Sequence, residues 1–247
     1  MNDVALRFAQ VAKNYSGVPA LVNFSLEVRR GEFFALVGVN GAGKTTLIKC
    51  LLDFCEADGG TIEIFGVPHR ATPARSRLAF LPERFNPPFY LTGRDFLRYM
   101  LELYRAPYDE ARIARAFAAL DLDLIALGRA ARTYSKGMTQ KLGLAACLLS
   151  GKDLYVLDEP TGGLDPKARV LLKAEMKALR RAGRTIFFTS HALADVAELC
   201  DRMAVLHAGQ LRFAGTPGEL TGRYGAPDLE QAFLACIASD AATAATP

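Results

Sequence analysis

A short run of small residues, closed by a lysine and two threonines, carries the most specific chemistry in this sequence. The run from Gly38 to Thr46 fits the phosphate-loop pattern G-x-x-x-x-G-K-[ST]. Glycines let such a loop curl so that successive backbone N–H groups point at phosphate oxygens. In this pattern Lys44 reaches the β- and γ-phosphates and the Thr45 hydroxyl ligates Mg²⁺. The run therefore predicts a site for nucleotide phosphates and a magnesium ion.

The segments on either side of this loop have the character that the pattern needs. An apolar run at Phe33–Val37 is typical of a buried strand, and Leu47, Ile48 and Leu51 follow at helical spacing. A helix there directs its positive N-terminal end at the anion, which disfavours a chance match in an ordinary glycine-rich turn. The predicted nucleotide contacts are Gly38, Asn40, Gly41, Ala42, Gly43, Lys44, Thr45 and Thr46.

Two neighbouring carboxylates, Asp158 and Glu159, directly follow a second apolar run, Leu154–Leu157. In parallel sheets, chemistry gathers where the strands end. A strand-end aspartate near a phosphate loop suits Mg²⁺, directly or through water. A second carboxylate beside it can orient and polarise an attacking water. We therefore predict that Asp158 binds the metal and that Glu159 is a catalytic base.

A histidine follows a third apolar run in the same way. Ser190 and His191 come directly after Thr185–Thr189. An isolated histidine is more often structural, but one at the same sheet edge as Lys44 and Glu159 can sense a γ-phosphate. The predicted catalytic side chains are therefore Lys44, Glu159 and His191.

Tyr15 lies in a predicted loop, Asn14–Gly17, and the residues alone leave two interpretations open. If the loop folds back over a nucleotide, the aromatic face can stack on adenine. Otherwise the ring packs within the loop and has no part in binding.

The middle of the chain changes to helical character from about residue 83 to residue 149. Thr92 and Asp95 have the spacing of a capping box, and Asp109 and Ser135 can cap two further helices. This stretch predicts an inserted helical subdomain at about residues 83–150, joined to the core through a proline-containing segment.

The two ends of the chain complete the predicted architecture. Alternating residues at Val4–Phe8 and Phe24–Val28 indicate an antiparallel sheet. We predict an α/β fold: a P-loop NTPase core of mixed or parallel sheet with flanking helices, an N-terminal antiparallel β subdomain and the inserted helical subdomain. The ATPase-type domain is expected over residues 1–222, a short helical extension over 223–239 and a disordered tail over 240–247.

Composition narrows the function classes. With 51% hydrophobic and 23% charged residues, the chain can form a sizeable core. The net charge of +4 is too small to indicate nucleic acid as a partner. There is no apolar run of about 18 residues that could span a bilayer and no pattern of a signal peptide at the start. The five cysteines lack zinc-site spacing, which favours buried thiols in a reducing cytosol.

Together and in order, these motifs resemble the ATP-binding subunits of ABC transporters over roughly residues 4–222. The resemblance implies ATP and Mg²⁺ as cofactors. It makes Asp158 the Walker B acid, Glu159 the catalytic glutamate and His191 the switch histidine. Tyr15 falls where the family has an aromatic residue that stacks on adenine.

Two further loops match the family. Ser135–Met138 matches the signature loop, and Gly162–Asp165 matches the loop after Walker B. The resemblance therefore adds Ser135, Gly137 and Asp165 to the predicted nucleotide contacts. The signature keeps its serine and second glycine but departs from LSGGQ, and this variant resembles that of exporters with membrane subunits of the ABC-2 type.

Glu83 is a departure from the family pattern, which usually places a glutamine there. A carboxylate can still ligate Mg²⁺, although it adds negative charge beside the phosphates. The expected metal ligands are therefore Thr45, Glu83 and Asp158.

The resemblance also implies a mechanism and partners. Two such domains close head to tail around two ATP molecules, with a second ATP-binding subunit as the other half. Hydrolysis drives substrate movement, here export, through an integral membrane permease subunit. The chain is then peripheral on the cytoplasmic face of the cell membrane, with no nucleic acid as a partner.

Three alternatives are weaker. A soluble ABC-family ATPase acting on nucleic acid or the ribosome would carry a long coiled coil between Lys44 and Asp158, or two cassettes, and the sequence has neither. A non-enzymatic, nucleotide-gated binding module would not need Glu159 and His191. A kinase would need an acceptor site, for which no pattern is found.

Overall fold

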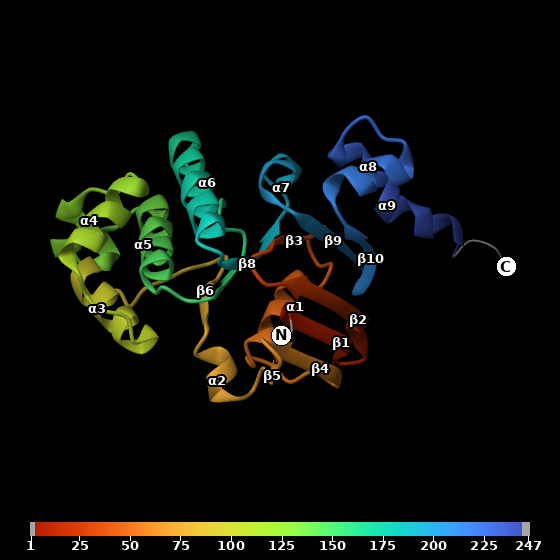
Figure 1. Ribbon diagram of the computed structural model, residues 1–247, viewed down its shortest axis with the longest axis horizontal. Helices are drawn as coiled ribbons and strands as arrows, with labels where there is room; N and C mark the ends of the chain where they lie inside the picture. Colours follow the sequence, from red (N-terminus) through yellow and green to blue (C-terminus); the bar gives the residue numbers. More distant parts are fainter. Residues whose placement is uncertain (1–2, 244–247) are drawn as a thin grey trace. The chain divides into compact units, whose positions relative to one another are not determined.

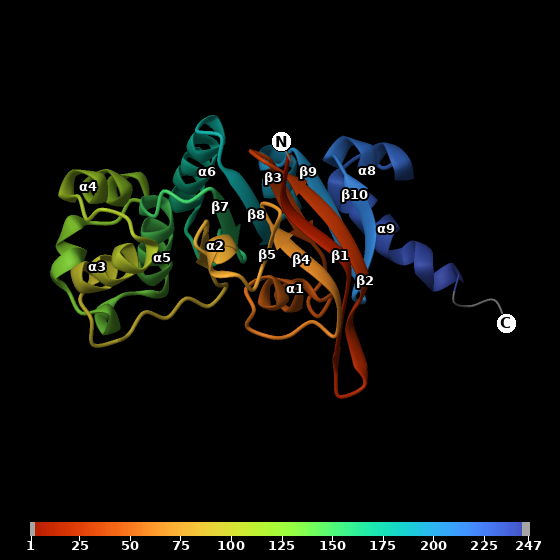
Figure 2. The same ribbon diagram turned by 60° about the horizontal axis from the view of Figure 1, so that its bottom comes forward.

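The computed structural model describes residues 3–243, which form two compact units. One unit contains residues 3–75 and 185–243, and the other contains residues 76–184. Figure 1 and Figure 2 together label the helices and strands of both units. The first unit holds the phosphate loop, and the second holds the strand that ends in two carboxylates.

An antiparallel sheet opens the first unit, with the strand order β2-β1-β4-β5. Its strands are β1 (Val4–Tyr15), β2 (Val18–Arg29), β4 (Gly59–Ile64) and β5 (Val67–Pro68). Ser16 and Gly17 have φ of 49° and 86° and make the two-residue turn between β1 and β2. Figure 2 shows this hairpin extending past the end of β4. The antiparallel sheet is confirmed, but the predicted loop at Asn14–Gly17 is only the tip of a long hairpin.

The strands that carry the phosphate loop are mostly parallel. β3 (Phe33–Val37) pairs in parallel with β8 (Thr185–Ser190) and β9 (Arg202–His207), and β10 (Gln210–Gly215) runs antiparallel to β9. All residues of β3 and β8 are buried, as expected for strands covered on both faces. Helices α1 (Lys44–Leu51) and α7 (Leu193–Leu199) follow β3 and β8, and the short α2 (Thr72–Arg75) ends this stretch of the unit.

Phenylalanine rings join the antiparallel sheet to the parallel strands. Phe8 of β1 lies 5.6 Å from Phe24 of β2 and 6.1 Å from Phe187 of β8, between ring centroids. Phe34 of β3 stacks on Phe187 at 6.1 Å. All four rings are buried, so this aromatic core fixes the strand that leads into the phosphate loop.

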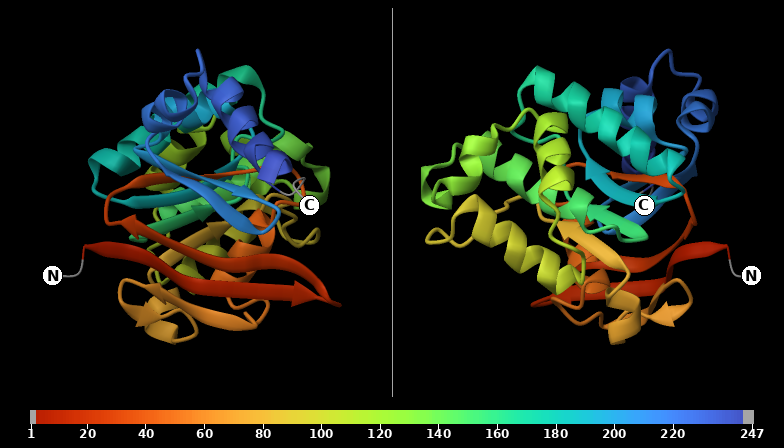
Figure 3. Two further views of the ribbon diagram at one scale, coloured as in Figure 1. Left: turned by 90° about the vertical axis from the view of Figure 1, so that its right-hand side faces the viewer. Right: turned by 60° about the vertical axis from the view of Figure 1, so that its left-hand side comes forward.

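Two helices end the first unit, α8 (Pro217–Tyr224) and α9 (Leu229–Thr243). Figure 3 shows them on the face of β9 and β10 away from the antiparallel sheet. Residue 222, where the ATPase-type domain is expected to end, lies inside α8, which a capping box at Thr216 and a left-handed Gly225 enclose. The predicted extension over 223–239 is the end of α8 followed by α9, which runs into the expected tail at 240–247. Residues 244–247 lie outside the described residues.

The second unit contains a parallel strand pair and the predicted helices. The strands are β6 (Leu78–Leu81) and β7 (Leu154–Leu157), which pair in register. The helices are α3 (Gly93–Tyr104), α4 (Glu110–Ala119), α5 (Lys136–Leu149) and α6 (Pro166–Arg181), with 3-10 turns at Leu124–Gly128 and Ala131–Thr133. The predicted caps are present: Thr92 accepts from the Asp95 N–H at 3.1 Å, and Asp109 accepts from the Arg112 N–H at 3.0 Å.

Candidate functional site

The phosphate loop depends on glycines at two positions because other chain segments pass close to them. A Cβ on Gly38 would lie 2.4 Å from the carbonyl oxygen of Leu206. A Cβ on Gly43 would lie 2.5 Å from the carbonyl oxygen of Ala20, and Gly43 also has a φ of 110°. No larger residue fits these positions without moving the backbone. The loop is therefore a preformed backbone cradle between β3 and α1.

Lys44 lies inside this cradle. Its side chain is largely buried, and its ammonium donates to the carbonyl oxygens of Gly38, at 2.6 Å, and Val39, at 3.3 Å. The Ala42 N–H donates to the Val39 carbonyl at 3.1 Å and closes the curl. The loop thus holds a positive charge beside backbone N–H groups at a helix N-terminus, an arrangement that favours an anion.

Most of the remaining predicted loop contacts are accessible. Asn40, Gly41 and Thr45 are exposed, and Thr46 is half-buried. Ala42 is buried, and its carbonyl accepts from the Gly209 N–H at 3.0 Å. Ala42 can therefore contribute to an anion site only through its backbone, whereas the Thr45 hydroxyl is available to a metal ion or phosphate.

His191 leaves the sheet at the same edge as the phosphate loop. In the parallel pairing of β3 with β8, Val37 is the partner of Ser190. Gly38 and His191 each follow those partners by one residue, and the His191 side chain is exposed. The Ala192 N–H donates to the Ser190 hydroxyl at 3.0 Å, which shapes the turn after the strand. The structure therefore brings Lys44 and His191 to one edge, as the sequence predicts.

Tyr15 ends β1 and is 43% exposed, so its ring can be reached from solvent. The Lys13 ammonium lies 5.5 Å from the ring centroid. Asp58 anchors this end of the strand, since it accepts from the Lys13 ammonium at 2.7 Å and from the Asn14 N–H at 2.6 Å. The Tyr15 hydroxyl donates to the Cys55 sulfur at 3.5 Å. An exposed aromatic ring with a fixed edge is suited to stacking on a planar ligand.

Asp158 and Glu159 lie where the parallel strands β6 and β7 end, in the second unit. Leu81 and Leu157 are partners in the β6–β7 pair, and the Asp158 N–H donates to the Leu81 carbonyl at 2.8 Å. Asp158 is 4% exposed and Glu159 9% exposed. Glu83 lies two positions beyond Leu81 and is exposed. The ends of β6 and β7 therefore bring three acidic residues to one edge of this unit.

Glu159 has a backbone conformation that its residue type rarely adopts. Its φ is 49°, in the left-handed region, where a residue with a Cβ is strained. The Gly162 N–H donates to the Glu159 carbonyl at 2.9 Å and holds this turn. A Cβ on Gly162 would lie 3.0 Å from the same carbonyl oxygen. The strain is kept by a tight turn, as is common where a side chain must be aimed for chemistry.

Ser135 is the N-cap of α5 in the second unit. Its hydroxyl oxygen accepts from the Met138 N–H at 3.2 Å, and the side chain is exposed. Gly137, in the first turn, is half-buried, and a Cβ there would lie 3.8 Å from the Gly163 carbonyl, an ordinary contact. Packing within the chain therefore does not demand a glycine at position 137. A small residue at the N-terminus of α5 instead leaves room for a ligand to approach the backbone.

Replacing Ser135 separates its capping role from any role toward a ligand. We expect Ser135→Ala to lower the free energy of unfolding by about 1 kcal/mol, because α5 loses a cap. Asp109→Ala is the matched control, since it removes the cap of α4 in the same unit. Denaturant unfolding should give similar losses for both, whereas only Ser135→Ala should lower nucleotide turnover. Equal turnover in the two variants would leave Ser135 with capping alone.

Asp165 has a clear structural role at the position where the sequence predicts a nucleotide contact. It is the N-cap of α6, and its carboxylate accepts from the Ala168 N–H at 2.9 Å. This hydrogen bond lowers the pKa of Asp165. The other carboxylate oxygen lies 3.8 Å from the ammonium of Lys141, which is buried and donates to the Asp121 carbonyl at 3.0 Å. The buried Lys141 has no signal in the sequence that would have revealed it.

The side chains predicted to bind magnesium are of a chemical type that suits the ion. Thr45, Asp158 and Glu83 supply hydroxyl and carboxylate oxygens, which are the ligands that Mg²⁺ prefers. The backbone of the phosphate loop, which depends on Gly38 and Gly43, supplies N–H donors for phosphates. None of the helices among residues 3–243 is both long and apolar enough to cross a bilayer.

Known proteins are similar to this chain in sequence and in fold. The ABC transporter family model matches residues 21–162. A Synechocystis protein described as an uncharacterized ABC transporter ATP-binding protein is 41% identical over 211 residues, 83% of this chain and 59% of that protein. The Nod factor export ATP-binding protein I of Burkholderia orbicola is 36% identical over 226 residues, 89% of this chain and 73% of that protein.

A solved structure described as the ATP binding subunit of an ABC transporter has a TM-score of 0.86 and 30% identity. The match covers 94% of this chain and 99% of that one. The chain spans about three fifths of the length of the Synechocystis protein, 59%, and of a second uncharacterized ABC transporter ATP-binding protein, from Nostoc, 62%. The family model covers more than half of the sequence and includes both the phosphate loop and the two carboxylates. The chain belongs to the ABC transporter family.

Proposed function

We propose that this chain is the ATP-binding and ATP-hydrolysing subunit of an ABC transporter. The observation that carries the proposal is the phosphate loop: glycines at 38 and 43 that no larger residue can replace, curled around the buried ammonium of Lys44. Asp158 and Glu159 directly follow another parallel strand of the chain, β7. A phosphate loop together with strand-end carboxylates is typical of magnesium-dependent nucleotide hydrolases.

In this proposal the first unit binds ATP. The backbone N–H groups of Gly38–Thr46 and the ammonium of Lys44 hold the β- and γ-phosphates, and Tyr15 stacks on the adenine. Thr45, Asp158 and Glu83 hold Mg²⁺, which neutralises charge on the phosphates when bound. Two observations support these roles: the Thr45 hydroxyl is exposed, and the Tyr15 ring is exposed on a strand end that Asp58 anchors.

Hydrolysis is assigned to Glu159 and His191. Glu159 orients the attacking water and accepts its proton, and His191 hydrogen-bonds the γ-phosphate. The strained φ of Glu159 supports a functional role, because strain of this kind persists where a side chain must be aimed. The register of β3 with β8 supports the role of His191, because it sets that residue beside the phosphate loop.

The remaining predicted contacts act toward a second ATP-binding subunit. Two such subunits close head to tail around two ATP molecules, and Ser135, Gly137 and Asp165 of each meet the nucleotide held by the other. The exposed hydroxyl of Ser135 at the start of α5 supports this, since a helix N-terminus attracts a phosphate. A site completed only on closure couples ATP binding to movement.

The permease partner is an integral membrane subunit, which places this chain on the cytoplasmic face of the cell membrane. The contact with it is assigned to residues 83–91, between β6 and α3. Phe89 and Tyr90 in this segment are 68% and 70% exposed, and their rings meet edge to face at 5.5 Å. Exposed aromatic pairs are typical of binding surfaces. Export is favoured by the form of the signature and by relatives named for Nod factor export.

Substitution of Tyr15 tests whether its ring stacks on adenine. We expect Tyr15→Ala to raise the Kd of ATP about tenfold, because stacking of a base on an aromatic ring contributes about 1–3 kcal/mol. Tyr15→Phe should bind more tightly than the alanine variant, since it keeps the ring and loses only the hydrogen bond of the hydroxyl to Cys55. Titration with a fluorescent ATP analogue measures both. Equal binding by the alanine variant would remove Tyr15 from the nucleotide site.

The ATPase proposal is tested by phosphate release from the purified chain with ATP, in the presence of Mg²⁺ or of EDTA. We expect turnover that requires Mg²⁺ and that rises with protein concentration more steeply than in proportion, because the site is completed by a second subunit. A chain that binds ATP but releases no phosphate at any concentration would contradict the proposal.

A further inference from the structure

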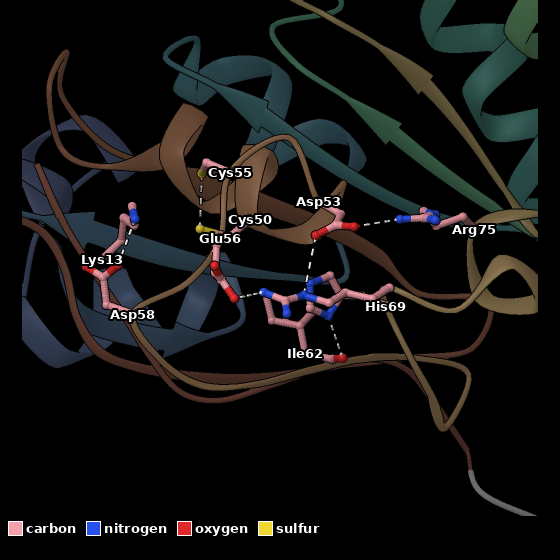
Figure 4. Close-up of polar contacts among 10 residues, drawn as sticks. Lys13, Cys50, Asp53, Cys55, Glu56, Asp58, Ile62, His69 and Arg75 are labelled. Carbon is pink, nitrogen blue, oxygen red and sulfur yellow. Dashed lines mark hydrogen bonds and ion pairs between the residues drawn. The ribbon is translucent and has the colours of Figure 1, made fainter.

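Two cysteine sulfurs face each other beside Tyr15 in the first unit. The Sγ atoms of Cys50 and Cys55 are 3.6 Å apart, and the Tyr15 hydroxyl donates to the Cys55 sulfur at 3.5 Å. Figure 4 shows the two thiols pointing toward one another at the end of α1. The pair therefore links the helix that follows the phosphate loop to the aromatic ring at the tip of β1.

The backbone at the end of α1 brings the two cysteines together. The Asp53 N–H donates to the Cys50 carbonyl at 3.1 Å, and the Phe54 N–H donates to the Lys49 carbonyl at 2.8 Å. With Asp53 at a φ of 62°, these bonds form a Schellman-type helix end. The chain turns back, and the Cys55 N–H also reaches the Lys49 carbonyl at 3.4 Å. A fixed turn, rather than a chance encounter, sets the distance between the sulfurs.

Ion pairs hold the same turn from the outside. The Asp53 carboxylate accepts from Arg75 at 2.8 Å and lies 3.4 Å from the Arg70 guanidinium. Arg70 also bonds Glu56 at 2.8 Å, on the other side of Cys55. Figure 4 shows the pair of Asp53 with Arg75 at this turn. Because the residues before and after Cys55 are both anchored, the thiol stays within reach of Cys50.

The two thiols have different surroundings. Cys50 is fully buried, and burial raises the pKa of its thiol to about 12. Cys55 is partly exposed. An oxidant in solution therefore reaches the Cys55 thiol before the Cys50 thiol, which is buried in the core. An accessible thiol with a second thiol in contact is the arrangement of a cysteine pair that senses oxidants.

We propose that Cys50 and Cys55 form a reversible disulfide under peroxide, and that this bond weakens nucleotide binding through Tyr15. The Cys55 thiolate attacks one peroxide oxygen, the O–O bond breaks, and the other oxygen leaves as water after taking a proton. The resulting sulfenic acid is attacked by the Cys50 sulfur. The S–S bond forms, the S–O bond breaks, and the hydroxyl leaves as a second water with the Cys50 proton. Two thiols are oxidised and one hydrogen peroxide is reduced.

The bond would move Cys55 away from Tyr15. A disulfide holds its sulfurs about 2.0 Å apart, so the observed separation of 3.6 Å must shrink. Cys50 is fixed inside α1, so the movement falls on Cys55, which gives up the hydrogen bond from the Tyr15 hydroxyl. The ring that would carry adenine then loses its hydrogen bond to the turn that follows α1. This consequence depends on the proposed function, whereas formation of the disulfide does not.

Peptide mapping of the full chain tests the disulfide. Trypsin cleaves after Lys49 and Arg70, so both cysteines lie in the single peptide 50–70. After treatment with hydrogen peroxide and then iodoacetamide, we expect this peptide to lack two hydrogen atoms and to carry no alkyl group. Dithiothreitol given before the iodoacetamide should restore two alkyl groups. Cys200, which is also partly exposed, should remain alkylated and is the internal control. A doubly alkylated peptide, or sulfinic acid on Cys55, would overturn the proposal.

Titration with a fluorescent ATP analogue tests the link to nucleotide. We expect peroxide to raise the Kd about three- to tenfold, the effect of one lost hydrogen bond, with recovery in dithiothreitol. Cys50→Ala and Cys55→Ser should make the Kd insensitive to peroxide, and the second variant serves if the first fails to fold. An unchanged Kd in chain shown to be oxidised would refute the link. If the reduced chain binds no ATP, the proposed function fails and the link with it, while the peptide result still decides the disulfide.

Discussion

The Glu159→Gln variant should bind ATP with a Kd within about threefold of the wild type and hydrolyse it at least about a hundredfold more slowly. A general base contributes about 10²–10⁴-fold to a rate, and glutamine keeps the size and hydrogen bonding of the side chain but cannot accept the proton. The variant should also remain closed with its partner while ATP is present, because hydrolysis is the step that releases closure. Phosphate release and ATP titration measure the two effects separately.

Glu102→Gln is the matched control for this variant. It makes the same change of charge in the same unit, on an exposed position of α3. Its turnover should equal that of the wild type. Wild-type turnover by Glu159→Gln would show that another group accepts the proton, and loss of ATP binding together with turnover would show that Glu159 acts in binding.

Lys44→Ala should raise the Kd of ATP by about a hundredfold, because hydrogen bonds from a charged donor to phosphate contribute about 1.5–3 kcal/mol. Turnover at moderate ATP concentrations should be lost with it. The ammonium also bonds the Gly38 and Val39 carbonyls, so the variant should loosen the loop as well. Isothermal calorimetry gives the Kd, and thermal unfolding without nucleotide measures the stability that is lost when the loop loosens.

Lys49→Ala provides the control, since it removes the same side chain from an exposed position of the same helix. It should bind ATP as the wild type does. If Lys44→Ala binds ATP as tightly as Lys49→Ala, the loop does not hold the phosphates through its lysine, and the phosphate site lies elsewhere.

Much of the fold followed from local rules in the sequence. Phe33–Val37 is predicted with the bounds that the structure shows, and the strand predicted from Leu154 to the two carboxylates ends at Leu157. Short continuous apolar runs bounded by turn residues are typical of buried strands. Thr92, Asp109 and Ser135 cap their helices as predicted, since capping depends on residues only three positions apart. Where a signal is local, the sequence is sufficient.

The surroundings of Tyr15 could not be predicted, because they depend on contacts between distant segments. Asp58 anchors the strand end that carries Tyr15, and Cys55 accepts from its hydroxyl, yet both lie about forty residues further along the chain. The length of the hairpin was also missed, since its outer part exposes both faces and loses the alternation that marks a strand. The φ of Glu159 leaves no trace in composition or spacing.

If this chain drives a transporter, its ATP-bound form should bind a membrane subunit, and a pull-down measures that binding. Tagged Glu159→Gln chain is incubated with detergent-solubilised native membranes in MgATP, recovered on affinity resin and identified with its partners by mass spectrometry. Lys44→Ala, which should bind ATP about a hundredfold more weakly, is the control. We predict recovery of one multi-spanning membrane protein with Glu159→Gln in ATP and a clear loss with Lys44→Ala. Recovery of only soluble proteins, ribosomes or DNA would contradict this expectation and move the ATPase out of transport.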